Sequence, residues 1–424
     1  MKTKKYKLIL LINAFLVALG ILFFSNNIIE YIIASNIKTY FSTAKIIYFE
    51  SKFNNFSLKL KDTNFVATIY GQFFPFRASV DGKINNLSMF NSLLNGKLKF
   101  NGEIIKNKNL IIKGNSFFAK GYLNFTCDLD NKVCKGQGEG FDTRKLAKIV
   151  NFNISGVKGK TDLKIDKNVV TLNTKGEFNN TILYVPFTAK TDITLKNNYI
   201  LFSSIIDSKI GKLNITQGKF NGKAINFVYK ANDINLSSFR KIFLYPLKGF
   251  VSVNGQYKDN ILKFRNKEIE GYKDKKLVIS LKMDSTRFFN YINIKPLIKG
   301  EVSGNIQIDK KGVFSLLISN AYFLQNSFTQ KLFHLTRIKI YNKFLNNVFF
   351  KGNFDNKKVE FSLVASNNNF YINFLNANFF YPNMFESEIS LSNQNIEYKI
   401  KIKNGIFKII DKRFKKKKQE ILVF

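Results

Sequence analysis

The feature that most constrains the fold of this chain is a period-two alternation of apolar and polar residues that repeats from about residue 34 onward. The clearest stretch is IEYKIKIK at 396–403, and KLKF at 97–100, TDLKI at 161–165 and KLVISLKM at 276–283 follow the same rule. Alternation places apolar side chains on one face of a strand and polar ones on the other. Breaks rich in Asn, Asp and Gly separate the stretches at spacings that suit hairpins. The sequence therefore predicts a mainly β fold of roughly 20 to 25 antiparallel strands.

A second unit recurs within this pattern. A short amphipathic helix begins at Asn or Asp, and a glycine and then a strand with a second glycine follow it. Asn and Asp accept hydrogen bonds from the free N–H groups of a first helical turn. The expected helices span 86–94, 142–150, 235–243 and 284–292, and the glycine pairs are Gly96 and Gly102, Gly156 and Gly159, Gly249 and Gly255, and Gly300 and Gly304. Four copies predict an internally repetitive, elongated β architecture. The alternative is a large β-sandwich with helical crossovers.

The N-terminus carries a basic start and an apolar run. Lysines at positions 2, 4, 5 and 7 precede residues 8–24, which are apolar apart from Asn13. The run is long enough to cross a bilayer, and the lysines place the N-terminus in the cytoplasm. We therefore expect an uncleaved single-pass signal-anchor, with the bulk of the chain outside the cytoplasm. A cleaved signal peptide is the competing interpretation.

The charge of the chain is strongly basic. Lys and Arg outnumber Asp and Glu 67 to 29, which gives a formal net charge of +38. Many of the lysines alternate with apolar residues along strands, where they form a solvated face, and no nucleic-acid motif is present. We expect no nucleic-acid partner, whereas contact with anionic phospholipid headgroups suits this charge.

The chain has two cysteines, Cys127 and Cys134, in the segment FTCDLDNKVCKG. A hairpin turn at Asp130 and Asn131 would place them on facing positions of adjacent strands, close enough for a disulfide. Two free thiols are the alternative. A metal site is disfavoured because two thiols without a neighbouring histidine or second pair make an incomplete ligand set.

Residues suited to catalysis are sparse. The one histidine, His334, lies in an apolar segment without a carboxylate or cysteine nearby in sequence. No nucleophile elbow, phosphate-binding loop, dinucleotide fingerprint, zinc-protease or calcium motif occurs. We therefore expect a non-enzymatic protein without a cofactor or a metal.

We predict four regions. They are an anchor at 1–33, a repetitive β-groove region at 34–325, a C-terminal β region at 326–411 with a helix near 330–338, and a basic tail at 412–424. The tail is either a solvated end or a contact with a membrane or a partner.

The repeated segments GVKGKTDLKI, KGFVSVNGQY and KGEVSGNIQI, together with the N-terminal anchor, resemble the AsmA-like family of bacterial envelope proteins. The stretch FLNNVFFKGNFDNKKVEFSLVAS is similar in its residue pattern to the C-terminal region of such proteins. The resemblance implies an inner-membrane protein whose periplasmic β-structure curls into an apolar groove. It also implies a role in outer-membrane biogenesis and phospholipid movement between the two membranes.

Physics leads to a compatible expectation. A sheet with one apolar face and few helices must fold on itself, pair with another sheet, or present that face to lipid chains. The candidate lipid-facing residues are Phe100, Leu163, Ile165, Ile279, Leu281 and Ile400. The expected partners are phospholipids and the inner membrane, with a possible outer-membrane or envelope protein. The alternatives are a scaffold for outer-membrane protein assembly, an anchored lipopolysaccharide carrier and an envelope hydrolase.

Overall fold

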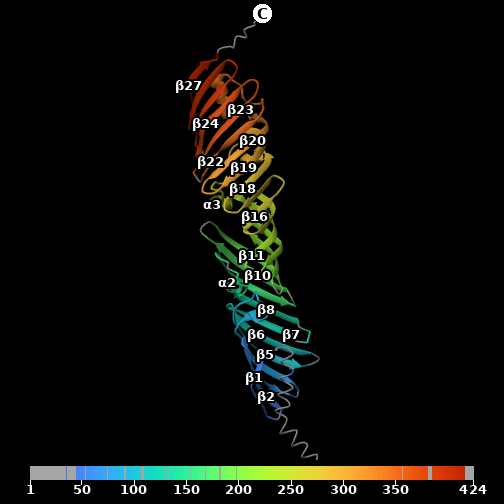
Figure 1. The fold of residues 1–424 in the computed structure, drawn as a ribbon. Coiled ribbons are helices and arrows are strands. Elements are labelled where there is room, and N and C mark those ends of the chain that lie inside the picture. The colour runs from blue at the N-terminus through green and yellow to red at the C-terminus, as the bar shows by residue number, and fades with distance from the viewer. Residues whose placement is uncertain are drawn as a thin grey trace, which may run out of the picture. The chain divides into compact units, whose positions relative to one another are not determined.

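The chain folds almost entirely into antiparallel β-sheet. The computed structural model describes residue 35 and residues 44–415, except 53, 74, 90, 91, 107, 108, 129, 132, 153, 168, 181, 182, 197, 356 and 381–383. Strands make up 66% of these residues, the sheet is curled, and helices are few and short (Figure 1). The predicted mainly β, antiparallel fold is confirmed. The predicted N-terminal anchor lies outside the described residues.

The strands follow one another closely. The first half of the chain contains β1 (Lys45–Lys52), β2 (Asn55–Lys61), β3 (Phe65–Gln72), β4 (Arg77–Ile84), β5 (Leu98–Lys106), β6 (Leu110–Phe118), β7 (Gly121–Asp128), β8 (Val133–Asp142), β9 (Val157–Asp166), β10 (Val169–Asn179), β11 (Tyr184–Leu195), β12 (Ile200–Ser208) and β13 (Gly211–Phe220). The second half contains β14 (Ile225–Asn235), β15 (Phe250–Lys258), β16 (Ile261–Arg265), β17 (Ile269–Lys273), β18 (Leu277–Asp284), β19 (Ile298–Ile308), β20 (Gly312–Phe323), β21 (Phe344–Leu345), β22 (Val348–Phe354), β23 (Lys358–Ser366), β24 (Tyr371–Phe380), β25 (Met384–Ser392), β26 (Ile396–Lys403) and β27 (Ile406–Phe414).

Two compact units make up the chain. Of the described residues, unit 1 comprises those up to Glu177 together with Thr188–Ser203 and Lys219–Lys223, and unit 2 comprises Phe178–Phe187, Ser204–Gly218 and those from Ala224 onward. In unit 1, strands β1 to β9 pair in sequence order, each antiparallel to the next. In unit 2, strands β14 to β20 do the same, β22 then pairs with β20, and the order continues to β27.

Short helices occur where the sequence predicts them. They are η1 (Leu87–Met89), α2 (Thr143–Ile149), η2 (Leu236–Phe239) followed by α3 (Arg240–Phe243), α4 (Ser285–Tyr291) and α5 (Ser327–Thr336). Asp142 caps α2 by accepting from the backbone N–H of Lys145 at 3.1 Å, and Asp284 caps α4 by accepting from that of Thr286 at 2.7 Å. The Asn or Asp at the start of each repeat therefore has the capping role expected for it.

The glycines of each repeat have two different roles. After α2 and η2–α3, Gly156 and Gly249 adopt φ values of +79° and +97°, which favour glycine because other residues are strained there. The second glycine allows close approach of the next strand. A Cβ at Gly159 would lie 2.7 Å from the carbonyl oxygen of Lys175, and one at Gly102 would lie 2.5 Å from that of Lys113.

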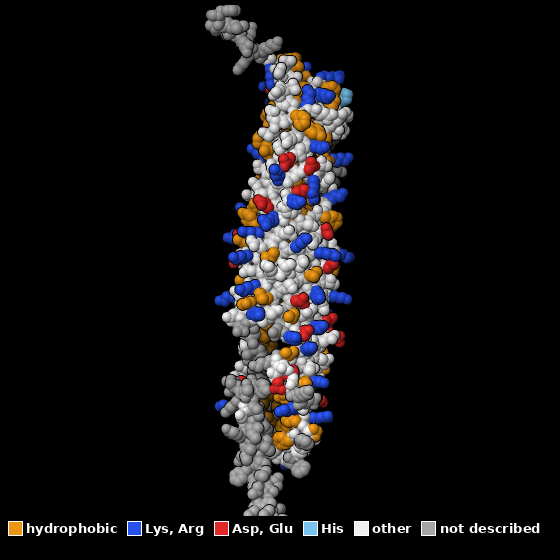
Figure 2. All heavy atoms as spheres, turned by 90° about the vertical axis from the view of Figure 1, so that its right-hand side faces the viewer, with side chains coloured by type: hydrophobic (Ala, Val, Ile, Leu, Met, Phe, Trp, Pro, Cys, Tyr) orange, Lys and Arg blue, Asp and Glu red, His pale blue; other side chains and the backbone are white. Residues whose placement is uncertain are grey.

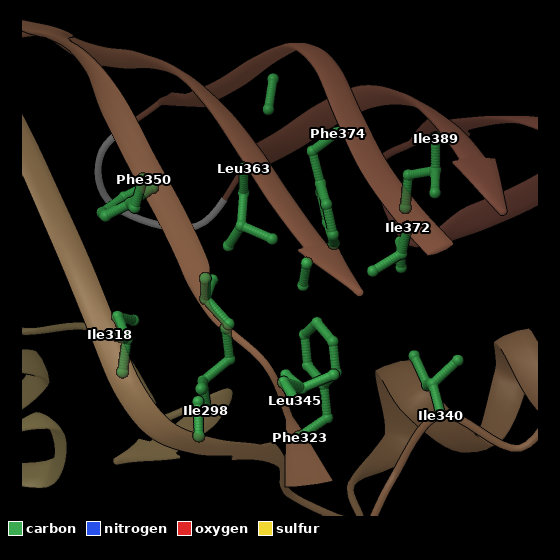
Figure 3. Packing of buried hydrophobic residues seen from close by; sticks show 14 of the residues in the cluster. Ile298, Ile318, Phe323, Ile340, Leu345, Phe350, Leu363, Ile372, Phe374 and Ile389 are labelled. Carbon is green, nitrogen blue, oxygen red and sulfur yellow. The ribbon is translucent and has the colours of Figure 1, made fainter. Parts of the chain in front are cut away.

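Unit 2 contains the largest hydrophobic core. Side chains from β18 to β26 meet α4, α5 and the segment that follows α5. Figure 3 shows Ile298, Ile318, Phe350, Phe374 and Ile340 converging on one interior from different elements. Several of these side chains are fully enclosed, so this part of the curled sheet is filled by protein.

Among its described residues, unit 1 contains two smaller cores. The first joins apolar side chains of β2 to β5, including Phe56, Leu58 and Val80. The second surrounds Phe141 and is bordered by Leu146 of α2. Within the part of the chain that is described, no helix is long and apolar enough to cross a membrane.

Candidate functional site

The inner face of the sheet in unit 2 can be followed from strand to strand by its register. Directly paired residues share a face of a sheet. Tyr229 pairs with Gly255, which pairs with Phe264, and Phe264 pairs with Gly271. Gly271 pairs in turn with Ile279, which lies in β18, a strand of the large core. The apolar faces of β14 to β17 therefore continue the inner face of the core strands.

The inner face of β15, β16 and β17 differs from the core because none of the residues in these three strands is buried. Their inward side chains are apolar but only half-buried. We define the open inner face by seven such side chains of β14 to β17: Phe227, Val251, Val253, Tyr257, Leu262, Phe264 and Ile269. Ile269, the member nearest to β18, also packs against the large core. From β18 onward, by contrast, inward side chains such as Leu281 and Val302 are buried. The inner face of β15 to β17 thus keeps its apolar side chains partly exposed to solvent.

The charged residues of these strands lie mainly on the other face. Lys263 and Arg265 of β16 alternate with Leu262 and Phe264 and are exposed. Lys273 is paired with Leu262, but its Nζ donates to the carbonyl oxygen of Lys275 at 2.9 Å and so reaches the turn. The open inner face therefore presents hydrocarbon and aromatic rings without a carboxylate.

Aromatic rings lie over glycines along the inner faces of both units. Phe264 pairs with Gly271, and a Cβ at residue 271 would lie 2.6 Å from its Cζ. The same arrangement joins Tyr229 to Gly255, with Oη 2.6 Å from the corresponding Cβ position. Other directly paired examples are Phe100 with Gly82, Phe125 with Gly114, Phe314 with Gly352 and Phe354 with Gly312. A ring that covers a glycine keeps apolar surface continuous where the sheet bends tightly.

Tyr229 is the polar group most changed by this environment. Its hydroxyl donates to the carbonyl oxygen of Lys263 at 3.1 Å. Burial disfavours the charged phenolate and raises the pKa of Tyr229 to about 12. The hydroxyl is therefore neutral at physiological pH and contributes no charge to the inner face.

The six candidate residues all lie on strands, but their environments differ. Phe100, Ile165 and Ile279 are half-buried. Leu163 and Leu281 are buried, at 8% exposure each, and belong to the cores beside α2 and α4. Ile400 is 0% exposed and is enclosed by the large core of unit 2. Period-two alternation identified the inward face, but it carries no information on whether protein fills the space above that face.

The structure places a disulfide between Cys127 and Cys134, which are directly paired residues of β7 and β8. Asp128 accepts from the backbone N–H of Asn131 at 3.0 Å in the turn between these strands. That hydrogen bond, followed in size by further bonds from the Asn131 and Asn109 side chains, lowers the pKa of the Asp128 carboxyl. The turn is thus held by both the carboxylate and the disulfide.

Chemistry-bearing clusters are scarce among the residues described. His334 is exposed on α5, with its ring centroid 5.9 Å from that of Phe333. No group of three or more His, Cys, Asp or Glu side chains within the described ranges could hold a metal ion. The arrangement that remains is an apolar surface suited to hydrocarbon.

Comparison with known protein families, with curated proteins and with solved structures finds no match to this chain. The resemblance to AsmA-like proteins therefore rests on the sequence pattern and remains a prediction.

Proposed function

We propose that this protein binds the acyl chains of phospholipids on the open inner face of β14 to β17 and carries them within the bacterial cell envelope, in a pathway of outer-membrane biogenesis. The observation that carries this proposal is the absence of any buried residue in β15, β16 and β17. Half-buried apolar side chains cost free energy in water, at about 25 cal/mol per Å² of apolar surface. An acyl chain lying along them would remove that surface from water without requiring any reaction.

The proposed cellular setting is the periplasm, with the chain anchored in the inner membrane by residues 8–24 and its sheet extended as an elongated, repetitive groove. The basic and apolar N-terminal sequence supports an anchor. The disulfide between Cys127 and Cys134 supports an oxidising compartment, because such bonds are rare in the reducing cytosol.

Site-specific photocrosslinking in the native bacterium tests the lipid proposal. A benzophenone amino acid at position 264 replaces a ring on the open inner face. The matched control at position 263 places the same group one residue away, on the exposed outer face. We expect phospholipid adducts, identified by mass, at position 264 and not at position 263. Equal labelling at both positions, or none at position 264, would contradict the proposal.

A substitution adds a functional arm to this test. Val253→Asp introduces a carboxylate into the open inner face, which should exclude hydrocarbon and reduce the crosslink at position 264. Asn254→Asp introduces the same charge on the exposed neighbouring residue and should leave the crosslink unchanged. A crosslink that survives Val253→Asp would place the lipid elsewhere.

A scaffold for outer-membrane protein assembly is the second candidate, and the edge strand β27 favours it. Among the described strands, β27 pairs with β26 only, and its Ile406 and Phe414 are each 73% exposed. A partner strand could extend the sheet at this edge. Co-purification of an envelope protein that is lost on Ile409→Pro, while bound lipid is absent, would favour the scaffold over the carrier.

A further inference from the structure

Three hairpin turns of unit 2 share an unusual composition. The β17–β18 turn contains Asp274, Lys275 and Lys276, and the β19–β20 turn contains Asp309, Lys310 and Lys311. The β22–β23 turn begins at Asp355 and leads into Lys357 and Lys358. Each turn thus combines one Asp with two Lys. We call the five exposed members the lysine rim: Lys275, Lys276, Lys310, Lys311 and Lys357.

The three turns lie on one edge of the sheet. Strands β17, β18, β19, β20, β22 and β23 pair in that order and are antiparallel, so every second connection returns to the same edge. Neighbouring turns are two strand spacings apart, which is about 10 Å. The lysine rim therefore extends for about 20 Å along one edge.

Hydrogen bonds in the third turn engage its aspartate and leave the neighbouring lysine available. Asp355 Oδ1 accepts from the backbone N–H groups of Lys357 and Lys358, at 2.8 and 3.0 Å. These bonds lower the pKa of the Asp355 carboxyl, and Lys311 of the preceding turn lowers it further, as expected for turns that are close in space. Lys358 is paired with Glu360. Among the described residues, none of the five rim lysines has an ion pair within 4 Å.

The opposite edge of the same sheet shows that this type of turn forms without lysines. In the β23–β24 turn, Asn367 Oδ1 accepts from the backbone N–H of Asn369 at 2.8 Å and of Phe370 at 3.0 Å. In the β25–β26 turn, Asn393 accepts in the same way from Asn395 and Ile396. Neither of these turns contains a charged residue. Turn geometry therefore does not explain the lysine rim.

Exposed apolar side chains flank the lysine rim on its own edge. Val313 follows the β19–β20 turn, and Ile406 begins β27 after the β26–β27 turn; they are 55% and 73% exposed. Figure 2 shows orange and blue side chains intermixed on the face in view. A line of lysines with an exposed aliphatic side chain within it, Val313, suits the interface of an anionic bilayer, where phosphates meet the first methylene groups.

From this arrangement we infer that the lysine rim docks unit 2 onto the surface of an anionic phospholipid membrane, with the lysines contacting headgroup phosphates. The contact orients the sheet with the edge that carries the lysine rim toward the membrane. This inference goes beyond the proposed carriage of acyl chains and does not depend on it, because a docked scaffold would use the same edge.

Amine footprinting of the full-length protein tests the inference residue by residue. The protein is treated with an amine-acetylating reagent, and mass spectrometry gives the reactivity of each lysine with and without vesicles. The vesicles contain phosphatidylcholine with phosphatidylglycerol, or phosphatidylcholine alone. The internal controls are five exposed outer-face lysines of unit 2: Lys230, Lys263, Lys351, Lys399 and Lys401.

We expect phosphatidylglycerol vesicles to lower the reactivity of the rim lysines at least about fivefold more than that of the control lysines. Equal protection of the two sets, or equal protection by pure phosphatidylcholine, would overturn the inference. Two soluble anions, tested without vesicles, distinguish membrane docking from other causes of protection of the rim lysines. Protection of the rim by glycerol phosphate alone would indicate a site for free phosphate, and matching protection by an oligonucleotide would indicate a general polyanion surface; either result would overturn it.

Two charge-matched variants complete the test. In one, the five rim lysines become Asn, and in the other, the five control lysines become Asn, so both lose the same net charge. Each lysine near an anionic surface strengthens binding about fivefold, so even partial contact by the five rim lysines should cost the rim variant at least about tenfold in vesicle affinity relative to the control variant. Equal losses would show that only the overall charge matters and would contradict the inference.

Discussion

Phe100 lies directly opposite Gly82 in the β4–β5 pair, and its ring occupies the space where a Cβ at residue 82 would lie. The ring atom Cε2 is 2.9 Å from that position, which is far inside van der Waals contact. The three atoms nearest to a Cβ at residue 82 all belong to this ring. Glycine at 82 is therefore explained by the side chain across from it and not by its own backbone.

This relationship predicts a coupling between the two positions. Gly82→Ala alone should lower the free energy of unfolding by about 1 to 3 kcal/mol, because the ring must move. In a protein that already carries Phe100→Ala, the same Gly82→Ala change should have little effect. Thermal or urea unfolding of the single and double variants measures the coupling free energy. Additive effects would show that the ring is not what excludes a side chain at residue 82.

A second prediction separates the filled part of unit 2 from its open inner face. Ile400 is fully enclosed, so Ile400→Asp places a charge in the core and should lower the free energy of unfolding by more than about 3 kcal/mol. Val253 is half-buried on the open inner face. Val253→Asp should lower the free energy of unfolding by about 1 kcal/mol or less, because water reaches the carboxylate. Similar losses for the two variants in urea titrations would show that the open inner face is filled.

A third prediction concerns the β7–β8 hairpin. The disulfide closes a loop between residues seven apart in sequence. By closing a loop this short, a disulfide restricts the unfolded chain and stabilises the folded protein by about 2 kcal/mol. Replacing both Cys127 and Cys134 by Ser should lower the stability of unit 1 by about that amount, measured by hydrogen exchange of β7 and β8. Unchanged exchange would mean that the bond adds nothing to the hairpin.

A fourth prediction follows from Tyr229. Its pKa in the folded protein is about 12, above the ordinary value of 10.0, so the folded state holds the phenolic proton more tightly than the unfolded state. The resulting stability is fully present below pH 10 and is lost as the pH rises through 12. A shift of this size corresponds to about 3 kcal/mol. The free energy of unfolding should therefore fall more steeply over this range in the wild type than in Tyr229→Phe. If the free energy of unfolding fell equally with pH in the wild type and in Tyr229→Phe, the raised pKa of Tyr229 would be contradicted.

Local signals in the sequence predicted much of the fold. Asp142 and Asp284 cap their helices, and the sequence predicted both. Few side chains can cap a helix, and the apolar residues that identify the helix follow within a few positions. Alternation likewise predicted which residues face inward, including Ile279 and Ile400. These features depend on neighbours in sequence, which a single chain displays directly.

The state of the inner face could not be predicted in the same way. Ile400 and Phe264 follow the same alternation, yet Ile400 is enclosed and Phe264 is half-buried. The difference arises because α5 and the segment after it cover the inner side of the C-terminal strands, whereas no buried residue occurs in β15 to β17. Coverage depends on contacts between elements far apart in sequence. The pairing of aromatic rings with glycines was missed for a related reason, since it depends on strand register.

The proposed function requires that hydrocarbon occupies the open inner face of β14 to β17. Native mass spectrometry of the purified full-length protein, followed by lipid extraction, measures whether phospholipid is bound. We predict phospholipid bound to the wild type and to Asn254→Asp, and at least about tenfold less bound to Val253→Asp. Wild-type protein that is lipid-free, or Val253→Asp protein that retains the same phospholipid, would contradict it.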